Sequence, residues 1–315
     1  MTASTPSVAA DTQRTALGYT LLLTGTLLFA FNGTIVKAIL LSGVGAASLS
    51  QVRATGAFVI LFLLVAILRP RALKIQRREW KLLLAYGVIG VSMTQFLYFI
   101  AIQRMPIGIA LIIEFTAPIW VVLWVRFGRR QSVRPTVWLG LLLALVGLAM
   151  VAQVWRGFTL DGLGVAAAFG AALALALFYI IGEHERRGPH ARDALSLTMW
   201  GMGGATLFWA IVQPWWLFSW ESFSGPVSQV AGTGPELPLL VLTGWMIVMG
   251  TVIPFALAMK ALAYINAAQA SIVGMTEPLI ASIIAWIVLA EVFTPLQMLG
   301  GVVVLAGVYL AERSR

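Results

Sequence analysis

The chain has 315 residues, of which 60% are hydrophobic and only 10% are charged, and its mean hydropathy is +0.93. Soluble domains carry about 25% charged residues, so this composition argues against a soluble enzyme, a nucleic-acid-binding protein and a disordered chain. The absence of cysteine excludes disulfides, thiol catalysis and cysteine-ligated metals. We therefore predict an all-α, polytopic membrane protein.

A helix needs about 20 apolar residues to cross the hydrocarbon core of a bilayer. Ten runs approach or exceed that length, at 17–39, 46–68, 82–102, 107–127, 136–154, 162–182, 195–218, 238–261, 267–289 and 296–311. The first run is longer than the apolar core of a cleavable signal peptide, so it is interpreted as a retained span. Residues 1–15 are expected to form a disordered cytoplasmic tail.

Basic residues give the expected orientation. Seventeen of the 21 Lys and Arg fall in connections on the side of the N-terminus, whereas Arg104 and Arg156 fall on the opposite side. Cytoplasmic loops carry an excess of Lys and Arg. The distribution predicts a multi-pass protein of the plasma (inner) membrane with both termini in the cytoplasm. It also explains the net charge of +9 without a nucleic-acid partner.

An internal repeat relates the two halves of the chain. An offset of 160 residues aligns 101–151 with 261–311 and matches two prolines, two glycines and a Thr-x-Pro motif, at Thr116/Thr276, Pro118/Pro278, Pro135/Pro295, Gly140/Gly300 and Gly147/Gly307. Each half then holds five helices, over 16–157 and 158–315, and an odd number makes the second half enter the membrane from the opposite side. Such inverted repeats are typical of secondary transporters that bind substrate at the repeat interface. A duplicated scaffold without transport activity is the alternative.

The motifs in these repeats resemble a known family. Residues 261–271 (ALAYINAAQAS), 276–279 (TEPL) and 297–301 (QMLGG) are similar to the EamA half-repeat of the drug/metabolite transporter superfamily. Residues 106–118 (PIGIALIIEFTAP) resemble the threonine/homoserine exporter branch. The resemblance implies ten helices in two repeats and export of a small metabolite.

Four charged residues lie within predicted spans: Lys37, Arg53, Glu114 and Glu277. A charge near the bilayer centre costs at least about 2.5–3.5 kcal/mol on insertion scales, so it normally faces a bundle interior or a wet cavity. The repeat offset carries Glu114 to position 274, three residues before Glu277, on the same helix face. We predict a central cavity with one of these acids on either side. The alternative is a neutralised glutamate with a packing role.

Further residues are candidates for the pathway. Pro118 and Pro278 each remove a backbone donor close to one of these acids, and are expected to kink their helices. Asn32, Gln95, Tyr98 and Arg53 are expected to line the substrate site, although an intramembrane Asn or Gln also serves as a helix–helix hydrogen bond. Lys37 lies near enough to the interface for its ammonium to reach the surface.

No cofactor or metal motif is found in the sequence. The run from Glu183 to Glu185 contains one histidine and sits next to Arg186 and Arg187, so it is interpreted as a solvated charge cluster and not as a zinc site. Catalysis is therefore not expected.

The predicted function is export of a small polar metabolite, with an amino acid as the favoured class, by alternating access. Burial favours a protonated carboxyl group and a nearby ammonium favours a charged one, so the two acids could couple export to protons. Alternatives are a multidrug or other metabolite transporter of the same fold, an uncoupled channel, and an integral-membrane enzyme acting on lipid-linked substrates. The sequence leaves open the substrate, the direction, the coupling ion and the oligomeric state.

Overall fold

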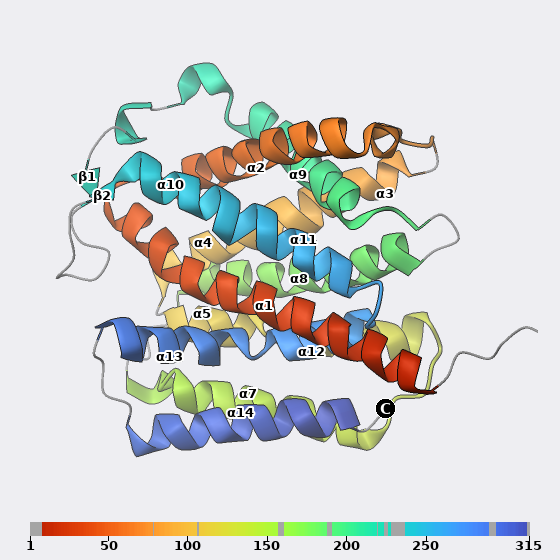
Figure 1. The fold of residues 1–315 in the computed structure, drawn as a ribbon. Coiled ribbons are helices and arrows are strands. Elements are labelled where there is room, and N and C mark those ends of the chain that lie inside the picture. Colours follow the sequence, from red (N-terminus) through yellow and green to blue (C-terminus); the bar gives the residue numbers. More distant parts are fainter. Residues whose placement is uncertain are drawn as a thin grey trace, which may run out of the picture.

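The computed structural model describes residues 8–77, 79–105, 107–156, 161–187, 191–218, 220–223, 226–227, 237–289 and 294–313. These contain ten helical rods, several of them divided into segments (Figure 1). They are α1 (Val8–Leu41), α2 (Ala46–Leu68), α3–α4 (Trp80–Ala85 and Thr94–Arg104), α5–α6 (Ile107–Glu114 and Ala117–Leu123), α7 (Pro135–Val151), α8 (Gly162–Arg187), α9 (Ala194–Val212), α10–α11 (Leu239–Ile247 and Ile253–Ala261), α12–α13 (Ala267–Gly274 and Glu277–Leu289) and α14 (Pro295–Arg313). The prediction of ten helices is confirmed.

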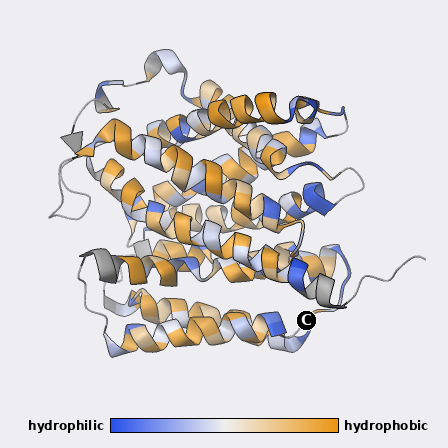
Figure 2. Ribbon diagram, in the orientation of Figure 1, coloured by the Kyte–Doolittle hydropathy of each residue, from blue (hydrophilic) through white to orange (hydrophobic). Residues whose placement is uncertain are grey.

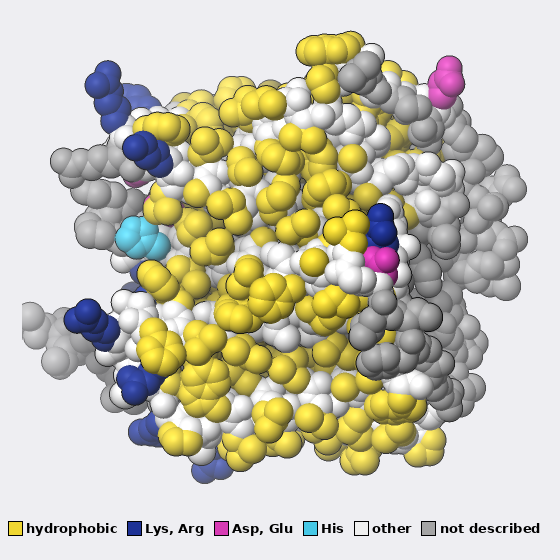
Figure 3. Space-filling model, turned by 180° about the vertical axis from the view of Figure 1, so that it is seen from behind, with side chains coloured by type: hydrophobic (Ala, Val, Ile, Leu, Met, Phe, Trp, Pro, Cys, Tyr) yellow, Lys and Arg dark blue, Asp and Glu magenta, His cyan; other side chains and the backbone are white. Residues whose placement is uncertain are grey.

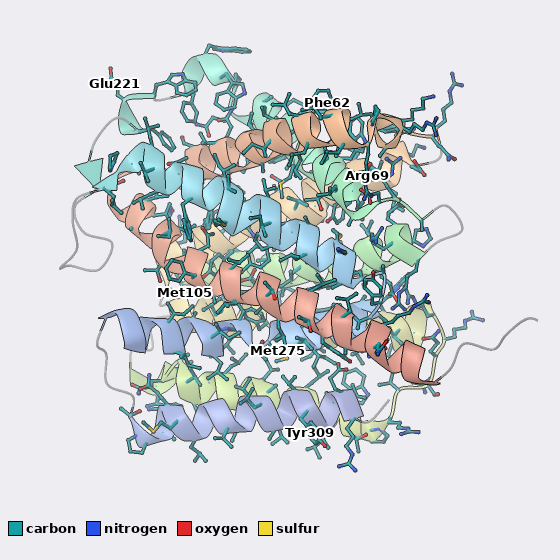
Figure 4. All side chains as sticks on the ribbon, viewed as in Figure 1. Phe62, Arg69, Met105, Glu221, Met275 and Tyr309 are labelled. Carbon is teal, nitrogen blue, oxygen red and sulfur yellow. The ribbon has the colours of Figure 1, made fainter. Side chains whose placement is uncertain are left out.

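The outside of the bundle is apolar. Hydrophobic residues run along the helices while hydrophilic ones gather toward their ends (Figure 2). Large side chains such as Phe62 and Tyr309 are 41% and 63% exposed, which suits contact with lipid chains. Most of the visible Lys and Arg side chains lie at one end (Figure 3), whereas Arg69 and Glu221 mark opposite ends (Figure 4). Among the residues that the structure describes, nine helical segments are long and apolar enough to cross a membrane, and α7 is shorter.

The helix contacts follow the repeat. α7 packs on α14 and α2 packs on α9, and these two pairs form opposite edges of the bundle (Figure 1). Between them, α4 packs on α8 and α11 packs on α1. In both contacts the third rod of one half packs on the first rod of the other half, as expected if the two halves are equivalent. α1 begins and α14 ends at the same end of the bundle.

Glycines show how the two halves are related. A Cβ atom added to Gly140 would lie 2.6 Å from the carbonyl oxygen of Gly307, and one added to Gly147 would lie 2.7 Å from that of Gly300. The repeat makes Gly140 equivalent to Gly300 and Gly147 equivalent to Gly307. Replacing each glycine by its equivalent turns one contact into the other, as a two-fold axis between the helices does. The pairing order makes α7 and α14 antiparallel. Equivalent helices that run antiparallel define an inverted repeat, which confirms that prediction.

Two structural features lie outside the ten predicted spans. α1 begins at Val8, inside the segment 1–15 that was expected to be disordered; its early residues include Ala9, Ala10 and Gln13, which favour helix. Residues 1–7 lie outside the described chain. The long connection near 219–237 includes two short antiparallel strands, β1 (Pro226–Val227) and β2 (Leu237–Pro238).

Candidate functional site

The fourth helix of each half is broken at its Thr-x-Pro motif. α5 ends at Glu114 and α6 begins at Ala117, while α12 ends at Gly274 and α13 begins at Glu277. The Thr116 hydroxyl donates to the carbonyl of Ile113 at 2.7 Å, and the Thr276 hydroxyl donates to that of Val273 at 2.7 Å. Both breaks fall 160 residues apart. Pro118 and Pro278, which follow the breaks, lack the backbone N–H that would continue α5 and α12.

Each break places a carboxylate inside the bundle. Glu114 is 8% exposed and Glu277 is half-buried. Their charges act on each other, and both act on Tyr98 and Tyr179. No hydrogen bond or salt bridge to either carboxylate occurs within the described ranges. One buried and one half-buried acid, neither with a protein partner among the described residues, therefore lie where the repeat predicts one acid per half.

Arg53 carries the opposite charge. This α2 residue is 5% exposed, and its guanidinium holds three neighbours. Nε donates to Thr251 Oγ1 at 2.6 Å, Nη2 donates to the Gly250 carbonyl at 2.8 Å, and Nη1 donates to Gln95 Oε1. The charges of Arg53 and Glu277 also act on each other, at more than salt-bridge distance. Arg53 therefore joins the two halves of the chain and lies within range of the charge of Glu277.

Local backbone irregularity explains why Gly250 can accept this bond. A π-helical segment, Val248–Val252, lies between α10 and α11, and Pro254 lacks the N–H that would bond the carbonyl four residues back. A second π-helical segment, Tyr86–Met93, lies at the equivalent place in the first half. There the Gly90 carbonyl is taken by the Thr94 hydroxyl at 2.9 Å. Only the second half offers its carbonyl to an arginine.

Asn32 lies against the same glycine. A Cβ atom added to Gly250 would lie 2.0 Å from Asn32 Oδ1, so the amide packs directly on the backbone that binds Arg53. Asn32 is 3% exposed, and Oδ1 has no hydrogen-bond partner in the part of the chain that the structure describes. At the equivalent contact in the first half, Gly90 is covered by Phe178.

A small cavity adjoins Arg53 and Gln95. The volume of this cavity is about 20 Å³. It is lined from α2, α9, α11 and the two π-helical segments with their flanks, by Ser50, Arg53, Ala54, Val91, Ser92, Gln95, Met202, Ala205, Trp209, Thr251 and Phe255. Sequence reasoning missed Ser50, Ser92, Gly250 and Thr251. Pro254, four residues after Gly250, was the available signal, because it frees the Gly250 carbonyl as Pro118 frees that of Glu114.

The remaining candidates fall into place as follows. Tyr98 is half-buried on α4, one turn beyond Gln95, and lies within range of the charges of Glu114 and Glu277. The side chain of Lys37 lies outside those that the structure describes. The three-residue run at the end of α8 is not a solvated cluster throughout: Glu183 and Glu185 are 5% and 7% exposed. Glu183 Oε2 lies 2.8 Å from Arg129 Nη2, and this ion pair explains why a carboxylate can be buried there.

Comparisons with known proteins agree with this architecture. Residues 16–153 and 162–312 each match the EamA-like transporter family. The chain belongs to the EamA-like transporter family. This EamA protein is therefore a membrane transporter of a small molecule and not an enzyme. Within the described residues, no group of three His, Cys, Asp or Glu side chains could hold a metal ion.

Named relatives of this EamA protein are distant. RhtA of Escherichia coli (strain K12), a threonine/homoserine exporter, is 26% identical over 241 residues, which cover 75% of this chain and 72% of RhtA. An uncharacterized transporter of Archaeoglobus fulgidus is 26% identical over 234 residues, covering 72% of this chain and 76% of that protein. A solved crystal structure superposes with a TM-score of 0.74 over 96% of this chain and 97% of that chain, at 15% identity, and so shows the fold.

Proposed function

We propose that this EamA protein exports a small zwitterionic metabolite of the amino-acid class from the cytoplasm across the inner membrane. The observation that carries the proposal is that the bundle interior holds one basic residue, Arg53, and two acids, Glu114 and Glu277, which form no salt bridge with it. An ammonium group fits beside the two acids, and a carboxylate fits beside the arginine. The name of RhtA supports the same substrate class.

Transport proceeds by alternating access. The two halves rock about the site at their interface, and the breaks at Thr116 and Thr276 let the fourth helix of each half bend close to its acid. Proton coupling follows from the same chemistry, because a carboxyl group that binds an ammonium in one state can bind a proton in the other. Both termini face the cytoplasm, since the basic residues gather at their end of the bundle.

The test is counterflow in proteoliposomes loaded with unlabelled amino acid. We expect accumulation of labelled threonine, homoserine or another neutral amino acid, saturable and competed by excess unlabelled substrate. Failure of every proteinogenic amino acid and of homoserine to exchange would contradict the proposal. A proton gradient imposed on the same vesicles is expected to change the efflux rate; an unchanged rate would exclude proton coupling.

A further inference from the structure

The cavity beside Arg53 is built from a basic group, neutral hydroxyls and apolar walls. No carboxylate lines it, whereas the guanidinium of Arg53 does. Met202, Trp209 and Phe255 form apolar walls. A buried charge in apolar surroundings is stable only when it is paired or well hydrogen-bonded. The field inside this cavity therefore favours an anion.

Two hydroxyl groups in the cavity lack protein partners. Ser50 and Ser92 are 4% and 3% exposed, and neither Oγ atom has a hydrogen-bond partner among the described residues. Both side chains line the cavity. A buried polar group without a partner costs about 1–3 kcal/mol, so two in one small space indicate that something else satisfies them. Ser92 lies in the π-helical segment Tyr86–Met93, a kind of irregularity that is frequent at functional sites.

Arg53 also has donors to spare. A guanidinium has five N–H groups, and three are used by Thr251, Gly250 and Gln95. All three acceptors are neutral, and Arg53 forms no salt bridge within the described chain. Its charge is therefore not compensated at close range, and the acid that acts on it, Glu277, does so from beyond salt-bridge distance.

We propose that this cavity is the carboxylate subsite of the transporter: one oxygen of a substrate carboxylate accepts from Arg53, and the hydroxyls of Ser50 and Ser92 donate to its oxygens. This assignment rests on the proposed function. It specifies in addition that the carboxylate end of the substrate enters the cavity. The ammonium then points toward Glu277 and Glu114. Because the space is small, the subsite takes a planar carboxylate and excludes bulkier anions such as sulfate.

The first test measures anion binding to the detergent-purified full-length protein, without any transport. Formate and acetate are the probes, and chloride, sulfate and methylammonium are the comparisons at equal ionic strength. We expect a saturable rise in Tm of about 2 °C or more with formate and acetate, and none with the others. An equal rise with chloride would show a halide site and overturn the assignment, as would no rise with formate.

Serine variants separate binding from folding. In Ser50→Ala/Ser92→Ala, the anion-free Tm should stay unchanged or rise, because the deleted hydroxyls have no protein partners to lose. The rise caused by formate should disappear. Ser271→Ala is the matched control: its buried hydroxyl bonds to the Ala268 carbonyl on its own helix, away from the cavity, and the formate response should persist. Persistence of that response in the double serine variant would contradict the proposal.

The second test uses counterflow and depends on the proposed function. An exchanged amino acid should be displaced by the free acid at least about 10-fold better than by its carboxamide or its decarboxylated amine, since each charge-assisted bond contributes about 1.5–3 kcal/mol. In Ser50→Ala/Ser92→Ala, the ratio of displacement by the free acid to displacement by the carboxamide or the amine should decrease. Equal competition by acid and amide would overturn the subsite even if amino acids are transported. Formate binding without amino-acid exchange would instead contradict the proposed function alone.

Discussion

At the scale of single residues, the interior of this protein separates opposite charges instead of pairing them. Arg53 bonds to neutral groups, and Glu114 and Glu277 have no hydrogen-bond partners in the described structure. A packing role for these charges would favour direct ion pairs, because a direct partner offsets the insertion penalty most effectively. Separated charges instead leave room for a substrate with one charge of each sign.

Substitution of the acids tests this arrangement. Glu114→Gln and Glu277→Gln keep the side-chain size and remove the charge, so the proteins should insert and migrate as the wild type does. Counterflow should fall at least about 10-fold in each, which corresponds to the loss of one charged hydrogen bond. Glu312→Gln, at the end of α14, serves as a control outside the site. Full counterflow in both site variants would contradict a role of Glu114 and Glu277 in substrate binding.

Gly250 offers a second test. A Cβ atom in Gly250→Ala would lie 2.0 Å from Asn32 Oδ1, so either the amide or the backbone that binds Arg53 must shift. We expect counterflow to fall about 10-fold or more, with membrane levels unchanged. Gly244→Ala on α10 is the control, because no atom lies within 4 Å of its added Cβ. Equal counterflow in the two variants would show that the position of Arg53 is unimportant.

At the scale of helices, small residues determine how close the two halves approach. In lipid, helix association depends on close packing and not on the hydrophobic effect. Gly147→Ala on α7 would place a Cβ atom 2.6 Å from the backbone nitrogen of Val304. We expect a loss of stability of about 1–3 kcal/mol from this overpacking, measured by unfolding in mixed micelles. Gly33→Ala on α1 meets nothing within 4 Å and should be neutral; equal losses in both variants would contradict the packing described here.

The helices also show where sequence reasoning succeeds and where it stops. Ten apolar runs and the 160-residue offset predict the ten helices and their inverted relation, because hydrophobic length and a matched Gly and Pro pattern depend on the chain alone. The π-helical segments at 86–93 and 248–252 leave no comparable pattern. The cavity residues Ser50 and Ser92 looked like ordinary small residues in apolar helices. Ser50 lies three residues before Arg53 on α2 and shares its helix face, whereas packing between helices brings Ser92 to the same cavity.

At the scale of the whole molecule, two oppositely inserted halves enclose the charges. α1 begins and α14 ends at the end of the bundle where most of the visible Lys and Arg lie, and we propose that this end faces the cytoplasm. A reporter fused after residue 315 should fluoresce as a cytoplasmic green fluorescent protein and be inactive as a periplasmic phosphatase. The opposite pattern would reverse the orientation and with it the direction of transport.

Alternating access of the site tests the central claim most directly, and the chain is suited to the measurement because it contains no cysteine. Tyr98→Cys places one thiol near the two acids and outside the small cavity beside Arg53. A membrane-impermeant maleimide should label it in both right-side-out and inside-out vesicles, and a transported amino acid should slow the labelling from either side. Labelling from one side only, or from neither, would contradict a central site that opens alternately to both faces of the membrane.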